Sequence, residues 1–277
     1  MTIINAEELR KAQIMKRLQE HYDEALEYFP ENRIVGIFLQ GSQNYGLDYE
    51  GSDIDTKLIV VPSFEEIVLN KRPVSTTHVR ANNEHIDFKD IRLYMETFRK
   101  QNLNFLEILF TPFKIINPMY AEQWEKLIVR REDIARMNVY RAVKSMKGIA
   151  LEKYYAMKHK YPSKLDIIEA YGYDGKQVSH LLRVEDYLER YIAGESYEKC
   201  LRPTESKRER IMDYKLLDRI PLAEACEEAE KVVEHVIAIA DEFCESGEDE
   251  EILAMRVLLQ EVQYEVMKIA IKEELVE

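Results

Sequence analysis

The sequence predicts an α+β protein, in which a small part containing strands is followed by a wholly helical part. Two short apolar runs, within 34–39 and 54–61, and an alternating polar and apolar segment at 84–89 are separated by turn residues, as β-strands are. Beyond Asn117-Pro118 the apolar residues recur with helical spacing. The 277 residues and 46% apolar content suffice for one large or two modest packed domains. We therefore expect domains at residues 1–118 and 119–277.

The first part is predicted element by element. Apolar residues at helical spacing indicate a helix over 6–28, which ends at Pro30-Glu31-Asn32. Ser63 is placed to cap a short helix after the second strand. Residues 70–83 are expected to form a loop, because they carry several turn signals and no clear period. The remaining expected elements are a helix at 91–100 and a short β-prone run at 113–116.

The second part is predicted to contain helices only. Gly247 separates the last two, which we expect to form an antiparallel hairpin. Pro162, Pro203 and Pro221 mark other breaks. The expected helices lie near 119–129, 132–158, 164–171, 175–193, 205–213, 221–245 and 249–275.

A Gly-Ser turn and two aspartates lie between the first two strands. Gly41-Ser42 follows the first strand, and Asp53 and Asp55 open the second. Alternate strand residues share a face, so both carboxylates are expected on one side. Mg²⁺ binds one or two carboxylates and completes its shell with water and phosphates, to which the turn can offer N–H groups. The alternative is a hairpin with a Gly-rich loop and two solvated aspartates.

This part of the chain resembles a known family. Gly41-Ser42-x-x-Tyr45-Gly46-Leu47, followed by Ser52-Asp53-Ile54-Asp55, is similar to the motif of the polymerase-beta-type nucleotidyltransferase superfamily. The form found here resembles its small bacterial and phage branch. The resemblance implies a small mixed-sheet nucleotidyltransferase domain, Mg²⁺ or Mn²⁺ as cofactor and an NTP as substrate. It also implies a third carboxylate on a neighbouring strand.

The third carboxylate is expected in the strand at 84–89. Strand alternation places Asp87 on the face opposite to Ile86 and Phe88, and Asp90 on the same face as those two residues. Asp87 is therefore the expected third metal ligand. Asp90 is expected to cap the following helix. Asp90 and Glu84 are the alternative candidates for the third ligand.

A second similar segment follows that strand. Residues 102–110 resemble the family segment N-P-N-x-L-E-x-L-F, with Leu103 in place of the usual proline. The resemblance makes Asn102, Asn104 and Glu107 candidates for bracing the site from behind. The alternative is that these residues cap and solvate a helix.

A third similar string lies downstream, at 172–183, and matches the branch pattern G-Y-D-x-K-x-x-x-H-x-x-R. Asp174 is a predicted helix N-cap, with Gln177 at capping-box spacing. The helix would place Lys176, His180 and Arg183 on one stripe, where they could hold a triphosphate. The alternative is a solvated basic stripe with a satisfied histidine.

The resemblance implies transfer of a nucleotidyl group from an NTP to an acceptor hydroxyl, with release of pyrophosphate. Asp53, Asp55 and Asp87 are the implied catalytic and metal-binding residues. Tyr45 is expected either to stack on the base or sugar or to be a core tyrosine. The alternative function is a non-catalytic, regulatory nucleotide-binding protein, such as a toxin–antitoxin or phage-defence component. The expected nucleotide-binding residues are Gly41, Ser42, Tyr45, Lys176, His180 and Arg183.

Charge bears on the acceptor. The net charge of −13 argues against indiscriminate binding of nucleic acid, and residues 221–277 carry 17 acidic and 4 basic residues. Residues 126–160, however, carry 10 basic and 3 acidic residues. A stripe of basic and aromatic residues there could bind an RNA 3′ end as the acceptor; a protein or a small molecule is the other expected acceptor. The alternative is a solvated helix that balances the acidic tail. The stripe comprises Arg136, Tyr140, Lys144 and Lys147.

The sequence also bears on location. No apolar run approaches the roughly 18 residues of a membrane span, and no signal peptide is visible. The three cysteines, Cys200, Cys226 and Cys244, are odd in number and far apart, which is typical of free thiols in a reducing compartment. A cytoplasmic protein is therefore expected, with no membrane partner and no indicated oligomeric state.

Overall fold

The computed structural model describes residues 6–216 and 220–276 and divides the chain into two compact units. Unit 1 comprises residues 1–99, 104–137 and 252–277, and unit 2 comprises residues 100–103 and 138–251. The α+β class is confirmed, because unit 1 contains a mixed sheet whereas the described part of unit 2 contains helices only. The division differs from the expected boundary at residue 118. Helices α6 (Ala121–Val129) and α14 (Leu253–Glu274) belong with the sheet.

The sheet of unit 1 has five strands in the order β3-β4-β2-β1-β5. Strands β2 and β4 are parallel, and the other neighbouring pairs are antiparallel. The segment between β2 and β4 includes a short helix, α3 (Phe64–Val68), which Ser63 caps as predicted. The strands are β1 (Ile34–Gln40), β2 (Asp55–Val60), β3 (Ser75–Val79), β4 (His85–Asp90) and β5 (Lys114–Ile116).

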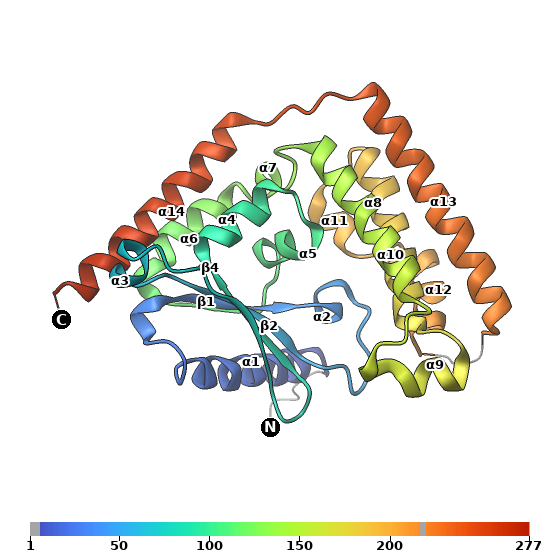
Figure 1. The fold of residues 1–277 in the computed structure, drawn as a ribbon, viewed down its shortest axis with the longest axis horizontal. Helices are drawn as coiled ribbons and strands as arrows, with labels where there is room; N and C mark the ends of the chain where they lie inside the picture. The colour runs from blue at the N-terminus through green and yellow to red at the C-terminus, as the bar shows by residue number, and fades with distance from the viewer. Residues whose placement is uncertain (1–5, 217–219, 277) are drawn as a thin grey trace. The chain divides into compact units, whose positions relative to one another are not determined.

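Each face of this sheet has its own helical cover (Figure 1). Leu58 and Phe88 belong to a core cluster that also contains Leu18 of α1 (Ala6–Ala25), so alternate residues of β2 and β4 face that helix. On the other face, Phe38 of β1 packs against Trp124 of α6, with ring centroids 4.6 Å apart. Helix α4 (Ile91–Arg99) contacts β2 and β4, and α14 packs on α4 and α6.

Unit 2 is built around α10 (Gly175–Ile192), which is largely buried and contacts four other helices. Tyr187, Tyr191 and Tyr197 form an aromatic cluster at its C-terminal half. The neighbouring helices are α8 (Val139–Ala156), α11 (Tyr197–Leu201), α12 (Glu205–Leu216) and α13 (Leu222–Ser246), and α9 (Leu165–Tyr171) precedes α10 in the chain.

Three local predictions differ from the structure. The expected loop at 70–83 contains β3, an edge strand with mostly exposed side chains. The expected helix at 132–158 is two helices, α7 (Arg131–Ala135) and α8, because the side chain of Asn138 accepts the Arg141 N–H and starts a new helix. The two helices of the predicted terminal hairpin belong to different units, α13 to unit 2 and α14 to unit 1. Among the described residues, no helix is both long and apolar enough to cross a membrane.

Candidate active site

Asp55 and Asp87 lie on one face of two adjacent parallel strands. Asp87 is the register partner of Lys57, which is two residues beyond Asp55 and so points the same way. Gln40, the register partner of Asp55 on β1, confirms this arrangement, since its Nε2 donates to Asp87 Oδ2 at 3.1 Å. The two carboxylates are partly exposed and lie on the face opposite to α1.

Each of these carboxylates is held by neighbouring donors. Asp55 Oδ1 accepts the His85 backbone N–H at 2.9 Å and lies 3.1 Å from His85 Nδ1. Asp87 Oδ1 accepts the Thr77 hydroxyl at 2.6 Å. His85 is a site residue that the sequence motif did not single out. The alternation of its strand could have found it, because His85 and Asp87 are two residues apart and share a face.

Asp53 is placed differently from the prediction. Strand β2 begins at Asp55, so Asp53 lies in the preceding loop, where it is exposed. In residues 6–216 and 220–276, the ligand atoms of Asp53, Asp55 and Asp87 do not all lie within 4.8 Å of one another. Like charges repel at short range, and Asp87 is turned toward Thr77 and Gln40. The three carboxylates therefore do not form a closed ligand cage in this structure.

The alternative third carboxylates are engaged elsewhere. Asp90 is 1% exposed, and its carboxylate accepts the Arg92 backbone N–H at 2.8 Å. The Arg92 guanidinium also binds this carboxylate, at 2.6 Å. Asp90 therefore caps α4, as predicted. Glu84 is 7% exposed and accepts from His21 Nε2 at 2.9 Å, with Arg17 also bound to it. Of the three candidates, only Asp87 shares the face of Asp55.

The Gly-Ser turn is tethered to the rest of unit 1. Gly41 has φ +90° and ψ −159°, a conformation that favours glycine, and precedes the short helix α2 (Ser42–Tyr45). The Gly41 N–H donates to Glu107 Oε1 at 3.2 Å. Asn44 donates to the Leu39 carbonyl at 2.9 Å and accepts the Thr111 hydroxyl at 2.7 Å. The turn that would contact phosphates is thus held in place from behind.

Lys57 is a second residue that the motif did not reveal. It is 3% exposed, its Nζ lies 3.6 Å from Glu107 Oε1, and it donates to the Asn104 carbonyl. Burial lowers the pKa of Lys57, and the nearby charges of Glu107 and Asp87 oppose that shift. Glu107 therefore connects the Gly41 turn to the strand of Asp55, which agrees with the predicted bracing role rather than with a solvated helix.

Tyr45 is 5% exposed. Its ring is packed in the protein and does not present an open face to a base. This placement matches the alternative of a core tyrosine. Ser42, by contrast, is partly exposed at the first position of α2.

The start of α10 agrees with the prediction. The Asp174 side chain accepts the Lys176 backbone N–H at 2.9 Å, and Gln177 Nε2 donates to the same carboxylate at 3.2 Å. The reciprocal bond of a capping box is absent from this turn, since the Asp174 N–H donates to the Met157 carbonyl at 2.7 Å.

The three predicted phosphate-binding residues of α10 differ in exposure. Lys176 is exposed, His180 is partly buried and Arg183 is 4% exposed. Burial lowers the pKa of His180 well below its usual value, and the charges of Arg183 and Lys176 lower it further. His180 is therefore neutral at pH 7. These residues belong to unit 2 and the aspartates to unit 1, so each group is described within its own unit.

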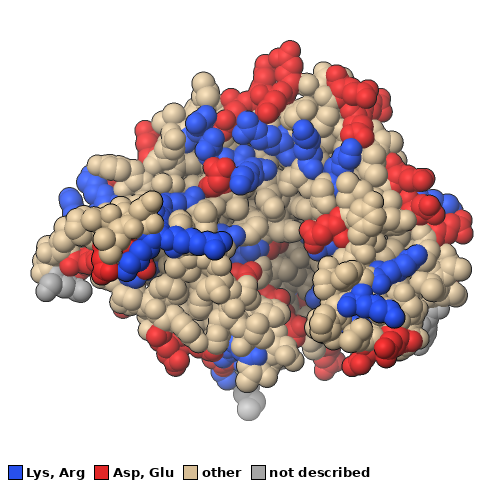
Figure 2. Space-filling view, viewed as in Figure 1, with Lys and Arg blue, Asp and Glu red and all other residues tan. Residues whose placement is uncertain are grey.

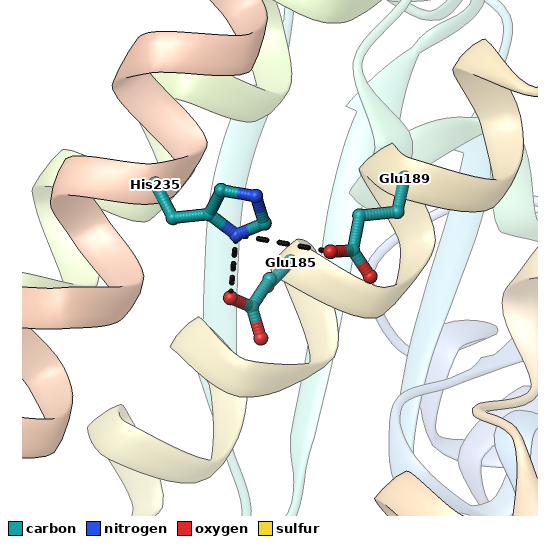
Figure 3. Close-up of side chains that lie close together, drawn as sticks. All are labelled: Glu185, Glu189 and His235. Atoms are coloured by element: carbon teal, nitrogen blue, oxygen red, sulfur yellow. Dashed lines mark hydrogen bonds and ion pairs between the residues drawn. The ribbon is translucent and has the colours of Figure 1, made fainter.

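A different group of possible metal ligands lies within unit 2 (Figure 3). Glu185 and Glu189 of α10 face His235 of α13, whose Nδ1 lies 2.9 Å from Glu185 Oε1 and 3.7 Å from Glu189 Oε1. Lys207 of α12 binds the second oxygen of Glu185 at 3.1 Å. A lysine already neutralises the buried carboxylate, so this group is an ion-pair cluster that joins three helices.

The basic segment is largely engaged with acidic residues. Lys147 Nζ lies 2.5 Å from Asp241 Oδ1, and Arg141 Nε lies 3.1 Å from Asp249 Oδ1. Arg136 lies between α7 and α8, so it does not continue a stripe on α8. Lysines, arginines and carboxylates are interspersed on the face that Figure 2 shows. These contacts agree with the alternative in which α8 balances the acidic residues of 221–277.

No protein-family model matches this chain, and no curated protein shows significant similarity to it.

Proposed function

We propose that this chain is a metal-dependent nucleotidyltransferase, which transfers a nucleotidyl group from an NTP to an acceptor hydroxyl. The observation that carries the proposal is the pairing of Asp55 and Asp87 on one face of adjacent parallel strands. The tethered Gly41-Ser42 turn follows β1, the other neighbour of β2. In the reaction, the acceptor oxygen forms a bond to the α-phosphorus and the α–β phosphoanhydride bond breaks. Pyrophosphate leaves, and the hydroxyl proton passes to solvent.

The donor set fits a hard cation. Asp55 and Asp87 are partly exposed carboxylates, and Asp53 adds a third, exposed carboxylate two residues from Asp55. Oxygen ligands of this kind suit Mg²⁺ or Mn²⁺. When bound, such a cation would supply positive charge to the phosphate oxygens. The protein itself orients Asp55 through His85 and places the Lys57 ammonium beside the carboxylates, on the same face of the sheet.

The acceptor is proposed to be a protein or a small molecule, with an RNA 3′ end as the remaining candidate. The ion pairs of Arg141 and Lys147 with aspartates leave little unbalanced charge on α8 for a phosphate backbone. We propose a cytoplasmic location, because three cysteines that are odd in number and far apart in the sequence are typical of a reducing compartment.

Incubation of the protein with each α-labelled NTP, Mg²⁺ or Mn²⁺, and either total RNA, total protein or a metabolite extract tests this proposal. Label should enter one acceptor class with one preferred base, and the Asp55→Asn variant should transfer it on the order of 100-fold more slowly. A wild-type protein that transfers no label to any of the three pools, with either metal, would contradict the enzymatic assignment.

A non-catalytic nucleotide-binding protein is the second candidate. The observation in its favour is that Asp55 and Asp87 are held separately, by His85 and by Thr77 with Gln40. This candidate predicts NTP binding without release of pyrophosphate. Equilibrium binding of an NTP, measured beside the transfer assay, distinguishes the two.

A further inference from the structure

A buried polar network lies on the face of the sheet opposite to Asp55 and Asp87. His21 of α1 is fully buried, and both ring nitrogens have partners, with Nδ1 2.9 Å from the Thr56 hydroxyl and Nε2 2.9 Å from Glu84 Oε2. An ionised carboxylate only accepts hydrogen bonds, so Nε2 carries the proton. Burial keeps the ring neutral by lowering its pKa, and Nδ1 then accepts the Thr56 hydroxyl.

The carboxylate of Glu84 accepts hydrogen bonds from three side chains and one backbone N–H. Its Oε2 accepts from His21, from Arg17 and, at 3.1 Å, from Arg80. Its Oε1 accepts the backbone N–H of Ile54 at 3.3 Å. Ile54 is the residue between the two aspartates of the motif. The buried side chain of Glu84, the residue before β4, thus binds the main chain of the Asp-x-Asp segment directly.

The contacts of Ile54 with Glu84 and of Thr56 with His21 restrain Asp55, because side chains alternate along a strand. Ile54 and Thr56 point toward α1, while Asp55 between them points toward the opposite face. The Ile54 amide is bound by Glu84, and the Thr56 side chain is bound by His21. The backbone is therefore held on both sides of Asp55, from the side that a nucleotide would not contact.

Core filling alone does not explain this network. The same face of the sheet is lined by Leu18, Ile54 and Ile86, and apolar residues in place of His21 and Thr56 would extend that core. Burying polar and charged groups among apolar ones is costly, and replacement of such groups by apolar residues is often neutral or stabilising. A role in holding the Asp-x-Asp segment in position would explain why these polar side chains are buried here.

We propose that His21 and Glu84 are positioning residues, which fix the main chain at Ile54 and Thr56 and thereby aim the carboxylate of Asp55. This inference rests on the proposed function, because it assigns Asp55 a metal to bind. The network itself is independent of that function and can be observed without any activity.

Thr56→Val tests the inference, because it removes one hydroxyl without changing the side-chain shape. Ile86→Val is the matched control. Ile86 is the register partner of Thr56, is fully buried in the same core and loses only a methyl group. Thr56→Ser is a second control, because it keeps the hydroxyl and removes only the methyl group. His21→Gln is the second variant, since its amide can reach Glu84 but not Thr56.

Binding of Mn²⁺ alone, measured by electron paramagnetic resonance, is the first measurement. Thr56→Val and His21→Gln should lower the affinity for Mn²⁺ about 10–100-fold, the usual effect of removing a group that orients a metal ligand. Thr56→Ser and Ile86→Val should stay close to wild type. Equal losses in Thr56→Val and Ile86→Val would overturn the inference, as would an unchanged affinity in Thr56→Val.

Amide hydrogen exchange of Ile54 and His85 is the second measurement, and it needs neither metal nor nucleotide. Both amides should exchange faster in Thr56→Val than in Ile86→Val, and equal rates would overturn the inference. A wild-type protein that binds no Mn²⁺ and transfers no nucleotide would instead contradict the proposed function. The exchange rates would still decide whether the network holds this segment.

Discussion

Lys57 Nζ lies 3.6 Å from Glu107 Oε1, and the two side chains are only 4% and 5% exposed. The pair joins β2 to the segment after α4, and Glu107 also accepts the Gly41 N–H. The Gly-Ser turn and the strand of Asp55 are therefore connected by one buried carboxylate. Loss of either member would leave the other charge buried.

The first prediction concerns this pair. Glu107→Leu should destabilise the fold by about 3–5 kcal/mol, because it leaves the Lys57 ammonium buried without its carboxylate. Lys57→Met combined with Glu107→Leu should cost less than the sum of the single variants, since both charges are then removed together. Urea unfolding of the two single variants and the double variant measures this coupling. Additive costs would show that the two charges do not interact.

The second prediction separates the carboxylates. Asp55→Asn and Asp87→Asn should each lower the rate of pyrophosphate release on the order of 100-fold. Both variants should remain folded, because the two side chains are partly exposed. Asp90→Asn should retain turnover but lose roughly 1–3 kcal/mol of stability, because it weakens the buried contact with Arg92. Steady-state kinetics and urea unfolding report the two effects. The reverse ranking of Asp87 and Asp90 would show that Asp87 is not the third carboxylate.

The third prediction concerns acid stability. Burial alone would raise the pKa of Glu84, but hydrogen bonds from His21 and Arg17 outweigh it and lower the pKa from 4.5 to about 2. A lowered pKa gives stability that is present above pH 4.5 and is lost as the pH falls toward 2, here about 3 kcal/mol in total. Urea unfolding between pH 7 and pH 2.5 measures this loss.

Glu84→Gln should flatten that pH dependence, whereas Glu65→Gln, at an exposed ion pair with Lys71, should change it much less. The two variants remove the same charge, so they differ only in the burial and partners of the carboxylate. A Glu84→Gln variant with the wild-type slope would refute the assignment of this stability to Glu84.

The fourth prediction concerns α10. Burial holds the pKa of His180 well below its usual value, so the ring is neutral at pH 7 and adds no charge to a phosphate site. His180→Gln should therefore show the same pH dependence of NTP affinity as the wild type. Lys176→Ala should weaken triphosphate binding more than monophosphate binding, because an exposed ammonium favours the more highly charged ligand. Calorimetric titrations with ATP and AMP provide the comparison, and equal losses would remove Lys176 from the phosphate site.

The fifth prediction concerns the basic segment. Lys147→Ala and Asp241→Asn should each cost less than about 1 kcal/mol, as partly exposed ion pairs do. Neither Lys147→Ala nor an Arg136→Glu/Lys144→Glu variant should change RNA affinity at low salt. A steep salt dependence of RNA binding in the wild type, made shallower in the double variant, would restore an RNA 3′ end as the preferred acceptor.

Much of unit 1 could be predicted from local patterns. β1, β2 and β4 have inward-facing apolar residues, and the alternation in β4 gave the correct face for Asp87. β3 was not predicted, because an exposed edge strand buries too few side chains to show an alternating apolar pattern. The break between α7 and α8 depends on the Asn138 cap, which competes with an otherwise continuous helical pattern.

The buried groups behind the site could not be predicted in this way. His21 contacts Glu84 across 63 residues of sequence, and Lys57 approaches Glu107 across 50. Such contacts arise from the packing of a helix or loop on the sheet, which no local period encodes. The sequence motif points to Asp55 and Asp87, and the resemblance of its segment to Glu107, whereas the contacts of His21 and Lys57 emerge only from the tertiary structure.

The division of the chain into units also bears on its biosynthesis. Unit 1 is interrupted after Met137 and resumes at Ile252, whose N–H donates to the Met137 carbonyl at 2.8 Å. A ribosome therefore releases the sheet, then all of residues 138–251, before it supplies the helix that packs on α4 and α6. The sheet of unit 1 is thus synthesised early, whereas the helix that completes its cover is synthesised only after residues 138–251.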